Sequence, residues 1–136
     1  MEYNHIMVRF GELYTKGKNR HDFIAILGRN IRNALSSFEN IEIEVRYDHI
    51  YVVLNGEDPE PIINVLKDVS GIFALSLVIK TNDDIENLKA VALEAMKLES
   101  GNTFKVKCKR SNKRYPIHSE EMNRIIAPVI LKNTDF

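Results

Sequence analysis

The stretch IEIEVRYDHIYVVL, residues 41–54, decides the fold of the N-terminal part of the chain. Its first half alternates apolar with charged side chains, which is typical of a half-buried strand. The dipeptide Asp48-His49 can turn the chain, and residues 50–54 then return as a second strand. The stretch therefore predicts a β-hairpin. The apolar side of its first strand is expected to carry Ile41, Ile43, Val45 and Tyr47.

The hairpin is preceded by the pattern of one strand and one helix. Ile6, Val8 and Phe10 are spaced two residues apart, which predicts a strand. A helix is expected from about Asn19, which suits its N-cap. The helix is indicated by apolar residues at spacings of three and four, namely Phe23, Leu27, Ile31, Ala34 and Phe38.

A second helix and strand are expected after the hairpin. Pro61 suits the first turn of the helix, Gly71 ends it, and residues 72–80 form an apolar strand. The order β-α-β-β-α-β over residues 1–80 is the ferredoxin-like arrangement, in which two helices cover one face of an antiparallel sheet. We therefore predict an α+β protein that begins with a ferredoxin-like domain over residues 1–80.

Residues 81–136 predict a second unit of the α/β type. Asp83 or Asp84 can cap a helix with an apolar stripe, and Ser119 with two following glutamates can open a final helix. Between the helices, alternation predicts a strand with one apolar and one basic side. The inward side chains would be Phe104, Val106 and Cys108, and the outward ones Lys105, Lys107 and Lys109. Because no strand follows the last helix, we expect this domain to be incomplete at its C-terminus.

Composition excludes several classes of protein. The chain has 19 Lys and Arg against 19 Asp and Glu, and no apolar run approaches the length of a membrane span. The N-terminus lacks the design of a signal peptide. The single cysteine, Cys108, cannot form an internal disulfide, so a cytoplasmic location is expected. Cys108 faces the predicted core, which favours a structural role, and the four histidines have no metal-ligand spacing.

Positive charge is nevertheless concentrated in residues 105–114, which contain six Lys and Arg and no acid. Many such runs are only solvated surface, but here the lysines share one side of a predicted strand. Arg110, Lys113 and Arg114 can pair with phosphates, and Tyr115 can stack on a splayed base. The residues alone predict binding of RNA or another polyanion. The alternative for Tyr115 is that it packs on the final helix.

The stretch GELYTKGKNR, residues 11–20, is a second candidate for anion binding. It leads into a helix, whose first amides can hold an anion, and it offers Lys16, Lys18 and Arg20. It lacks the Gly-x4-Gly-Lys-Ser/Thr spacing of a phosphate-binding Walker loop. An acylphosphatase-like hydrolase has an anion loop at the same point of this fold, so such an enzyme is one alternative. A solvated basic loop is the other.

Two stretches, VRFGELYTKGKNRHDF (8–23) and FKVKCKRSNKRYPIHSEEMNR (104–124), carry a family resemblance. The first resembles the start of the bacterial tRNA 4-thiouridine synthetases, sulfurtransferases also known from thiamine biosynthesis, although Phe10 stands where the family has tyrosine. The matching positions are Gly11, Glu12, Lys16, Gly17, Lys18, Asn19 and Arg20. The second resembles the THUMP domain of the same family. Ala127-Pro128 replaces the family's glycine pair, which should kink or end the last helix.

The resemblance implies that residues 81–136 are a THUMP domain. It also implies an ATP-dependent parent enzyme that makes 4-thiouridine at tRNA position eight, resembles enzymes that supply sulfur for the thiamine thiazole, and has a cysteine desulfurase as partner. The nucleotide loop and the sulfur-carrying cysteine are expected outside these residues, so this fragment should hold the tRNA acceptor stem and 3′ end without a cofactor or catalytic residue.

The residues expected to bind tRNA are Lys16, Lys18, Arg20, Lys105, Lys107, Lys109, Arg110, Asn112, Lys113, Arg114 and Tyr115. Membrane association is not expected, and formation of a homodimer is left open. A THUMP module of another RNA-modifying enzyme is the remaining alternative.

Overall fold

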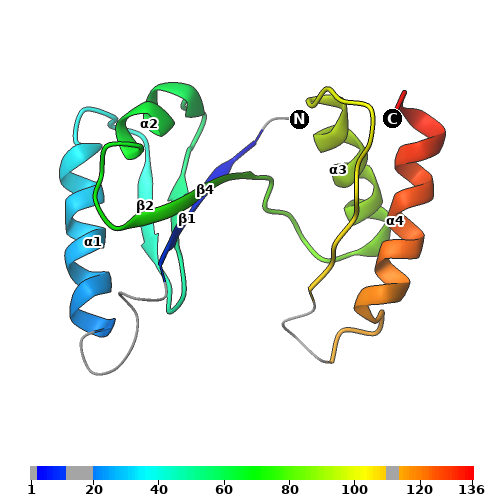
Figure 1. The fold of residues 1–136 in the computed structure, drawn as a ribbon, viewed down its shortest axis with the longest axis horizontal. Helices are drawn as coiled ribbons and strands as arrows, with labels where there is room; N and C mark the ends of the chain where they lie inside the picture. Colours follow the sequence, from blue (N-terminus) through cyan, green and yellow to red (C-terminus); the bar gives the residue numbers. More distant parts are fainter. Residues whose placement is uncertain (1–2, 12–19, 110–113) are drawn as a thin grey trace. The chain divides into compact units, whose positions relative to one another are not determined.

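The computed structural model describes residues 3–11, 20–109 and 114–136, which divide into two compact units on either side of Lys80 (Figure 1). The first unit contains β1 (His5–Phe10), α1 (Arg20–Ala34), β2 (Glu42–Val45), β3 (Ile50–Val53), α2 (Pro59–Leu66) and β4 (Ile72–Val78). The strands form one sheet in the order β2-β3-β1-β4, and all neighbours are antiparallel. This topology confirms the predicted ferredoxin-like arrangement and the α+β class.

The hairpin of β2 and β3 is closed by a tight turn, in which the Arg46 amide donates to the His49 carbonyl at 2.9 Å. Val45 pairs with Ile50 at the last position of the ladder. Tyr47 therefore lies in the turn and is 76% exposed, so the expectation that it belongs to the apolar side of the strand was wrong. Alternation along the sequence continues past the residue at which strand pairing stops.

The core of the first unit lies between the sheet and the two helices that cover one of its faces (Figure 1). In β1 and β3, every second side chain faces this core, as the alternation predicts. Its buried members are Ile6, Val8, Phe10, Ile24, Leu27, Ile31, Leu35, Ile50, Val52, Leu54, Ile62 and Leu66. Such a closed core holds the sheet and both helices in fixed positions.

The connection through α2 depends on two local features. Asp58 caps the helix by accepting a hydrogen bond from the Glu60 amide at 3.1 Å, and Pro59 suits the first turn. The helix ends at Leu66, and Gly71 then turns the chain into β4 with a φ of +95°. A Cβ atom at Gly71 would also come within 3.1 Å of Cζ of Phe23. Glycine is therefore required here for both backbone conformation and space.

The second unit contains two helices, α3 (Ile85–Lys97) and α4 (Ser119–Asn133). Asp84 is the residue that caps α3, accepting from the Asn87 amide at 3.3 Å. Helix α4 has its first residue at Ser119 and its cap position at His118, which makes no side-chain capping bond. Ser119 is therefore not the cap that the sequence indicated. Glu120 and Glu121 do lie in the first turn, where they complement the positive end of the helix.

Pro128 lies inside α4, and the helix continues beyond it to Asn133. Of the two effects expected from this proline, termination of the helix does not occur. Helix α4 therefore keeps a buried stripe on both sides of Pro128, formed by Met122, Ile126 and Ile130.

The predicted strand over residues 104–109 does not form. A strand needs a neighbouring backbone to complete its hydrogen-bond ladder, and the described part of this unit has only helical elements beside the segment. Its side chains still alternate, because Phe104, Val106 and Cys108 pack on the α4 cluster. The apolar contacts predicted for this segment are present, but they are made with a helix. No helix in the described ranges is long and apolar enough to cross a bilayer.

Candidate nucleic-acid interface

A basic surface of the second unit is formed by three exposed lysines, Lys105, Lys107 and Lys109, which we call the lysine row. Each follows a half-buried neighbour that packs toward α4, so the three ammonium groups are carried on the outer side of the segment. Alternate residues of an extended chain are roughly 7 Å apart. Within the described part of the chain, no ion pair involves these lysines. The row therefore presents charge that nearby carboxylates do not neutralise.

Tyr115 packs on the final helix, which was the alternative to base stacking for this residue. Its ring is half-buried and packs on the α4 cluster, and its hydroxyl donates to the Asp83 carbonyl at 2.5 Å. Burial, followed by the nearby carboxylates of Asp83 and Asp84 and the thiol of Cys108, raises the pKa of Tyr115. Stacking of this ring on an RNA base stays a prediction. Arg114, beside it, is exposed.

Several other predicted tRNA-binding residues lie outside the described ranges. They are Lys16, Lys18, Arg110, Asn112 and Lys113, and the proposed N-cap Asn19 lies there too. The predicted anion loop of residues 11–20 is therefore represented by its two ends, Gly11 and Arg20.

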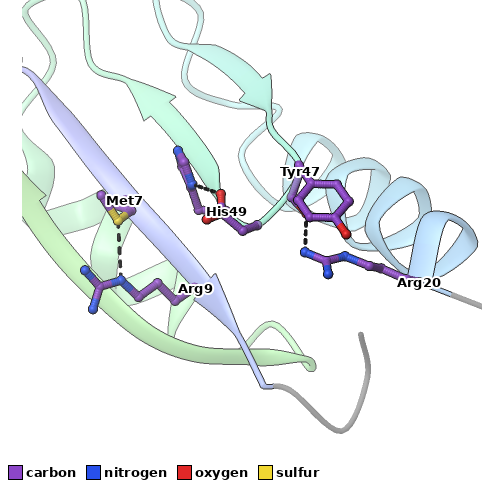
Figure 2. A network of polar contacts seen from close by, with 6 residues as sticks. Met7, Arg9, Arg20, Tyr47 and His49 are labelled. Atoms are coloured by element: carbon purple, nitrogen blue, oxygen red, sulfur yellow. Dashed lines mark hydrogen bonds and ion pairs between the residues drawn. The ribbon is translucent and has the colours of Figure 1, made fainter. Parts of the chain in front are cut away.

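Arg20, the first residue of α1, is held against the turn of the hairpin (Figure 2). Its guanidinium carbon lies 3.7 Å from the centroid of the Tyr47 ring, and its Nη2 donates to the Tyr47 carbonyl at 2.8 Å. The Nε atom of the same guanidinium is shielded from solvent and makes no hydrogen bond in the described structure. Leaving a donor unpaired costs free energy, so the ring contact and the Nη2 bond must maintain this geometry.

A hollow of about 520 Å³ lies beside this stack, and we call it the hairpin hollow. It is lined by Arg20, His21, Ile24, Ala25, Val45, Arg46 and Tyr47. Sequence reasoning missed this hollow, because it assigned Tyr47 to the apolar side of a strand and had no sign that Arg20, at the start of the expected helix, would contact it. The available signal was the tyrosine directly before the Asp48-His49 turn.

The sheet face opposite the helices carries a third group of polar and aromatic side chains, centred on Tyr51. The rings of His5 and His49 meet Tyr51 edge-on at centroid distances of 5.5 and 4.6 Å, and Lys80 Nζ lies 5.4 Å from its centroid. Burial and then the Lys80 charge lower the pKa of His5, against an opposing effect of Glu44. On β1, Arg9 Nε donates to the Met7 sulfur at 3.4 Å (Figure 2).

The described side chains and the two hollows can be compared with what a metal ion or ATP would need. No three His, Cys, Asp or Glu side chains gather in a way that could hold an ion within the described ranges. Another hollow, of about 630 Å³ at the ends of α3 and α4, is lined by Lys97 and Lys132 but also by Glu99 and Asp135, so the two acids offset the attraction of the two lysines for a phosphate. The hairpin hollow lacks a carboxylate for the Mg²⁺ that accompanies ATP. No chemical step on ATP is therefore assigned to these residues.

Comparison with sequence families and curated proteins covers the whole described fold. Residues 5–76 match the ThiI ferredoxin-like domain, and residues 80–135 match the THUMP domain. The chain is 49% identical over 135 residues to a probable tRNA sulfurtransferase from Pediococcus pentosaceus, covering 98% of this chain and 33% of that protein. It is 44% identical over 137 residues to that of Bacillus subtilis, covering 99% and 34%. The chain therefore spans about a third of the length of these relatives.

Two solved structures share the arrangement. A 4-thiouridine synthetase in complex with RNA and bound ATP superposes with a TM-score of 0.83 at 28% identity, covering 98% of this chain and 34% of that one. PH1313 from Pyrococcus horikoshii superposes with a TM-score of 0.77 at 30% identity, covering 97% and 45%. The family match over residues 5–76 takes in more than half of the 136 residues, and the chain belongs to the ThiI ferredoxin-like domain family.

Proposed function

We propose that this chain is the tRNA-holding part of a tRNA sulfurtransferase and that the lysine row binds the phosphates of the tRNA. The observation that carries the proposal is the row itself, three exposed ammonium groups outside the ion pairs of the described structure, in a segment matched by the THUMP domain. The names of the curated relatives and the RNA complex of the similar 4-thiouridine synthetase support it.

The chemistry of the row suits a partner whose sequence varies. Lysine ammonium groups are point charges that pair with phosphate oxygens and release condensed counterions, without reading a base. A row of such groups fixes the position of an RNA backbone and leaves sequence unread. An enzyme that modifies many different tRNAs needs this kind of contact.

The further part of the proposal concerns the acceptor arm. We place the acceptor stem and the unpaired 3′ end on residues 105–115, so that the uridine at position eight reaches a catalytic domain elsewhere in a longer cytoplasmic protein. That domain would use ATP to replace the uridine oxygen with sulfur delivered by a cysteine desulfurase, and the same sulfur would serve thiamine synthesis. The role of the present residues is to hold and position the RNA.

The test compares two triple variants of this chain by fluorescence anisotropy with labelled tRNA. Replacing Lys105, Lys107 and Lys109 by Gln should weaken binding on the order of 100-fold at about 0.1 M salt and lower the slope of log K against log salt by roughly 2 to 3. The control replaces Lys67, Lys89 and Lys97, which removes the same charge elsewhere. Lys89 and Lys97 are already paired with Glu86 and Glu94 at 3.2 and 3.6 Å. Equal losses in both variants, or none in either, would contradict the proposal.

A second measurement tests the acceptor-end assignment. Removing the unpaired 3′ nucleotides from the tRNA should weaken binding to the wild-type chain, because single-stranded ends expose bases and backbone that a duplex hides. The loss should shrink in the lysine-row variant, since the same contacts are already missing. Unchanged affinity for the trimmed tRNA would show that the chain holds another part of the molecule.

A further inference from the structure

The two walls of the hairpin hollow come from parts of the first unit that the core holds together. One wall is the first turns of α1, and the other is the end of β2 with the turn that follows it. The walls meet closely at Gly28, where a Cβ atom would lie 3.1 Å from Cγ2 of Val45. Glycine therefore allows α1 to approach β2 at this point. The two walls of the hollow are therefore held in place by backbone packing between α1 and β2.

The aromatic wall is exposed and its conformation is fixed. Tyr47 is 76% exposed even though the Arg20 guanidinium lies against its ring. The hydrogen bond from Arg20 to the Tyr47 carbonyl ties the same guanidinium to the turn. Most of the Tyr47 ring is accessible to a planar partner, and its backbone lies in a closed turn. The side chain therefore loses little conformational entropy when such a partner stacks on it.

The ionisable side chains that line the hollow are Arg20, His21 and Arg46, and none of the lining residues is acidic. Two acids of the neighbouring hairpin have partners there. Glu44 accepts from Arg46 at 3.0 Å, and Asp48 contacts His49 at 2.5 Å. A guanidinium has five N–H donors. Arg46, whose side chain is 52% exposed, therefore keeps donors that can reach a phosphate.

From this geometry we infer that the hairpin hollow is a second RNA-binding site, which takes an unpaired nucleotide with its base on Tyr47 and its phosphate on Arg46. The inference rests on the proposed function and adds a site to it. A stacked duplex does not fit, because A-form bases are hidden from a ring that projects from a turn. A splayed nucleotide offers both the planar face and the anion that these side chains are suited to bind.

The experiment measures binding of this chain to a labelled short single-stranded RNA and to a labelled blunt RNA duplex. Tyr47→Ala should weaken binding of the single strand by roughly 5- to 100-fold, the range expected for one lost stacking contact. It should leave duplex binding and the salt slope unchanged. Tyr47→Phe, which keeps the ring, should bind like wild type. Arg46→Gln should lower the single-strand salt slope by about 0.7.

The matched control is Phe73→Ala, which removes an aromatic side chain that is 79% exposed and does not line the hollow. It should leave single-strand binding unchanged, and thermal melting should show that every variant is still folded at the temperature of the binding experiment. Single-strand binding by Tyr47→Ala at wild-type strength would overturn the inference while the lysine-row proposal stands. An equal loss in Phe73→Ala, or on the duplex, would overturn it as well.

Displacement of the single strand by ATP in wild type but not in Tyr47→Ala would show a free-nucleotide site instead. Failure of the wild-type chain to bind any RNA would defeat both proposals.

Discussion

The two units of the chain carry their positive charge in different ways. Among the described residues of the first, twelve buried side chains from the helices, the sheet and the positions next to them form the main core, and the Arg20–Tyr47 stack lies at the surface. In the second, three residues of α4 form the buried cluster, and the lysine row lies on a segment without a strand partner in the described structure. The position of the Arg20–Tyr47 stack is set by tertiary packing. The position of the lysine row is set by the alternation of side chains along one segment.

This difference separates what each surface can recognise. Binding by the lysine row should tolerate movement of the segment, because charge interactions with phosphates fall off gradually with distance. Stacking in the hairpin hollow should not, because a base must lie flat on a ring that is held in place. A change in packing should therefore affect the two surfaces unequally.

The largest effect is expected from truncating the two cores in turn. Ile31→Ala, at a fully buried position of α1, should destabilise the first unit by about 2–5 kcal/mol. Ile130→Ala in α4 should cost less, because the smaller cluster around it leaves fewer contacts to lose. The free energy of unfolding of each unit is read from its own amide signals by NMR in urea. Equal loss in both units from either change would mean that they unfold together.

A smaller effect is expected at two glycines of the first unit that share a positive φ. Gly56→Ala, at +89° with no atom within 4 Å of the added Cβ, should cost about 1–3 kcal/mol from backbone strain. Gly71→Ala, at +95°, has the same strain and must also displace Phe23. Chemical denaturation of the two variants should therefore show Gly71→Ala as the more destabilised. The reverse order would show that Phe23 is not closely packed here.

The second unit can be tested at a single hydrogen bond. Tyr115→Phe removes the bond to the Asp83 carbonyl and keeps the ring, so it should destabilise this unit only slightly, because water can replace an exposed hydrogen bond. Tyr115→Ala, which also removes the ring from the α4 cluster, should cost more. Thermal melting gives the stability, and anisotropy with tRNA gives the affinity. A loss of affinity in Tyr115→Ala at unchanged melting temperature would favour base stacking over packing.

The smallest effect concerns pH. The pKa of His5 is lowered in the folded chain by burial and by Lys80, so the neutral ring is the form that the fold favours. Its contribution to stability is therefore complete above the ordinary pKa of about 6.5 and is lost as the pH falls through the lowered value. His5→Gln should flatten this part of the profile of unfolding free energy against pH. His118→Gln, in the other unit, is the control. An identical profile in wild type and His5→Gln would contradict the assignment.

The fold of the first unit was predictable because periodicity reports which side of an element is buried. The period of two in β1 and the spacing of three and four in α1 both correspond to side chains that face the core. The same signal failed at two places, since it does not report pairing. Residues 104–109 alternate against a helix, and Tyr47 continues the alternation after β2 has ended.

The candidate site was predictable only in part. The lysine row follows from local pattern, and the structure shows its three side chains exposed. The hairpin hollow depends on the contact between Arg20 and Tyr47, which are 27 positions apart, and on the close approach of Gly28 to Val45. Such contacts arise from tertiary packing, and neither spacing nor composition records them.

Pro128 has a kinetic consequence for α4. It has no backbone N–H, so the Arg124 carbonyl lacks its usual helical donor and the hydrogen-bond ladder is interrupted at that point. Beyond it, the last carbonyls are satisfied by side chains, with Asn133 donating to Val129 and Thr134 to Ile130, both at 2.7 Å. In amide hydrogen exchange the helix should therefore open as two segments, and the short one after the proline should exchange first.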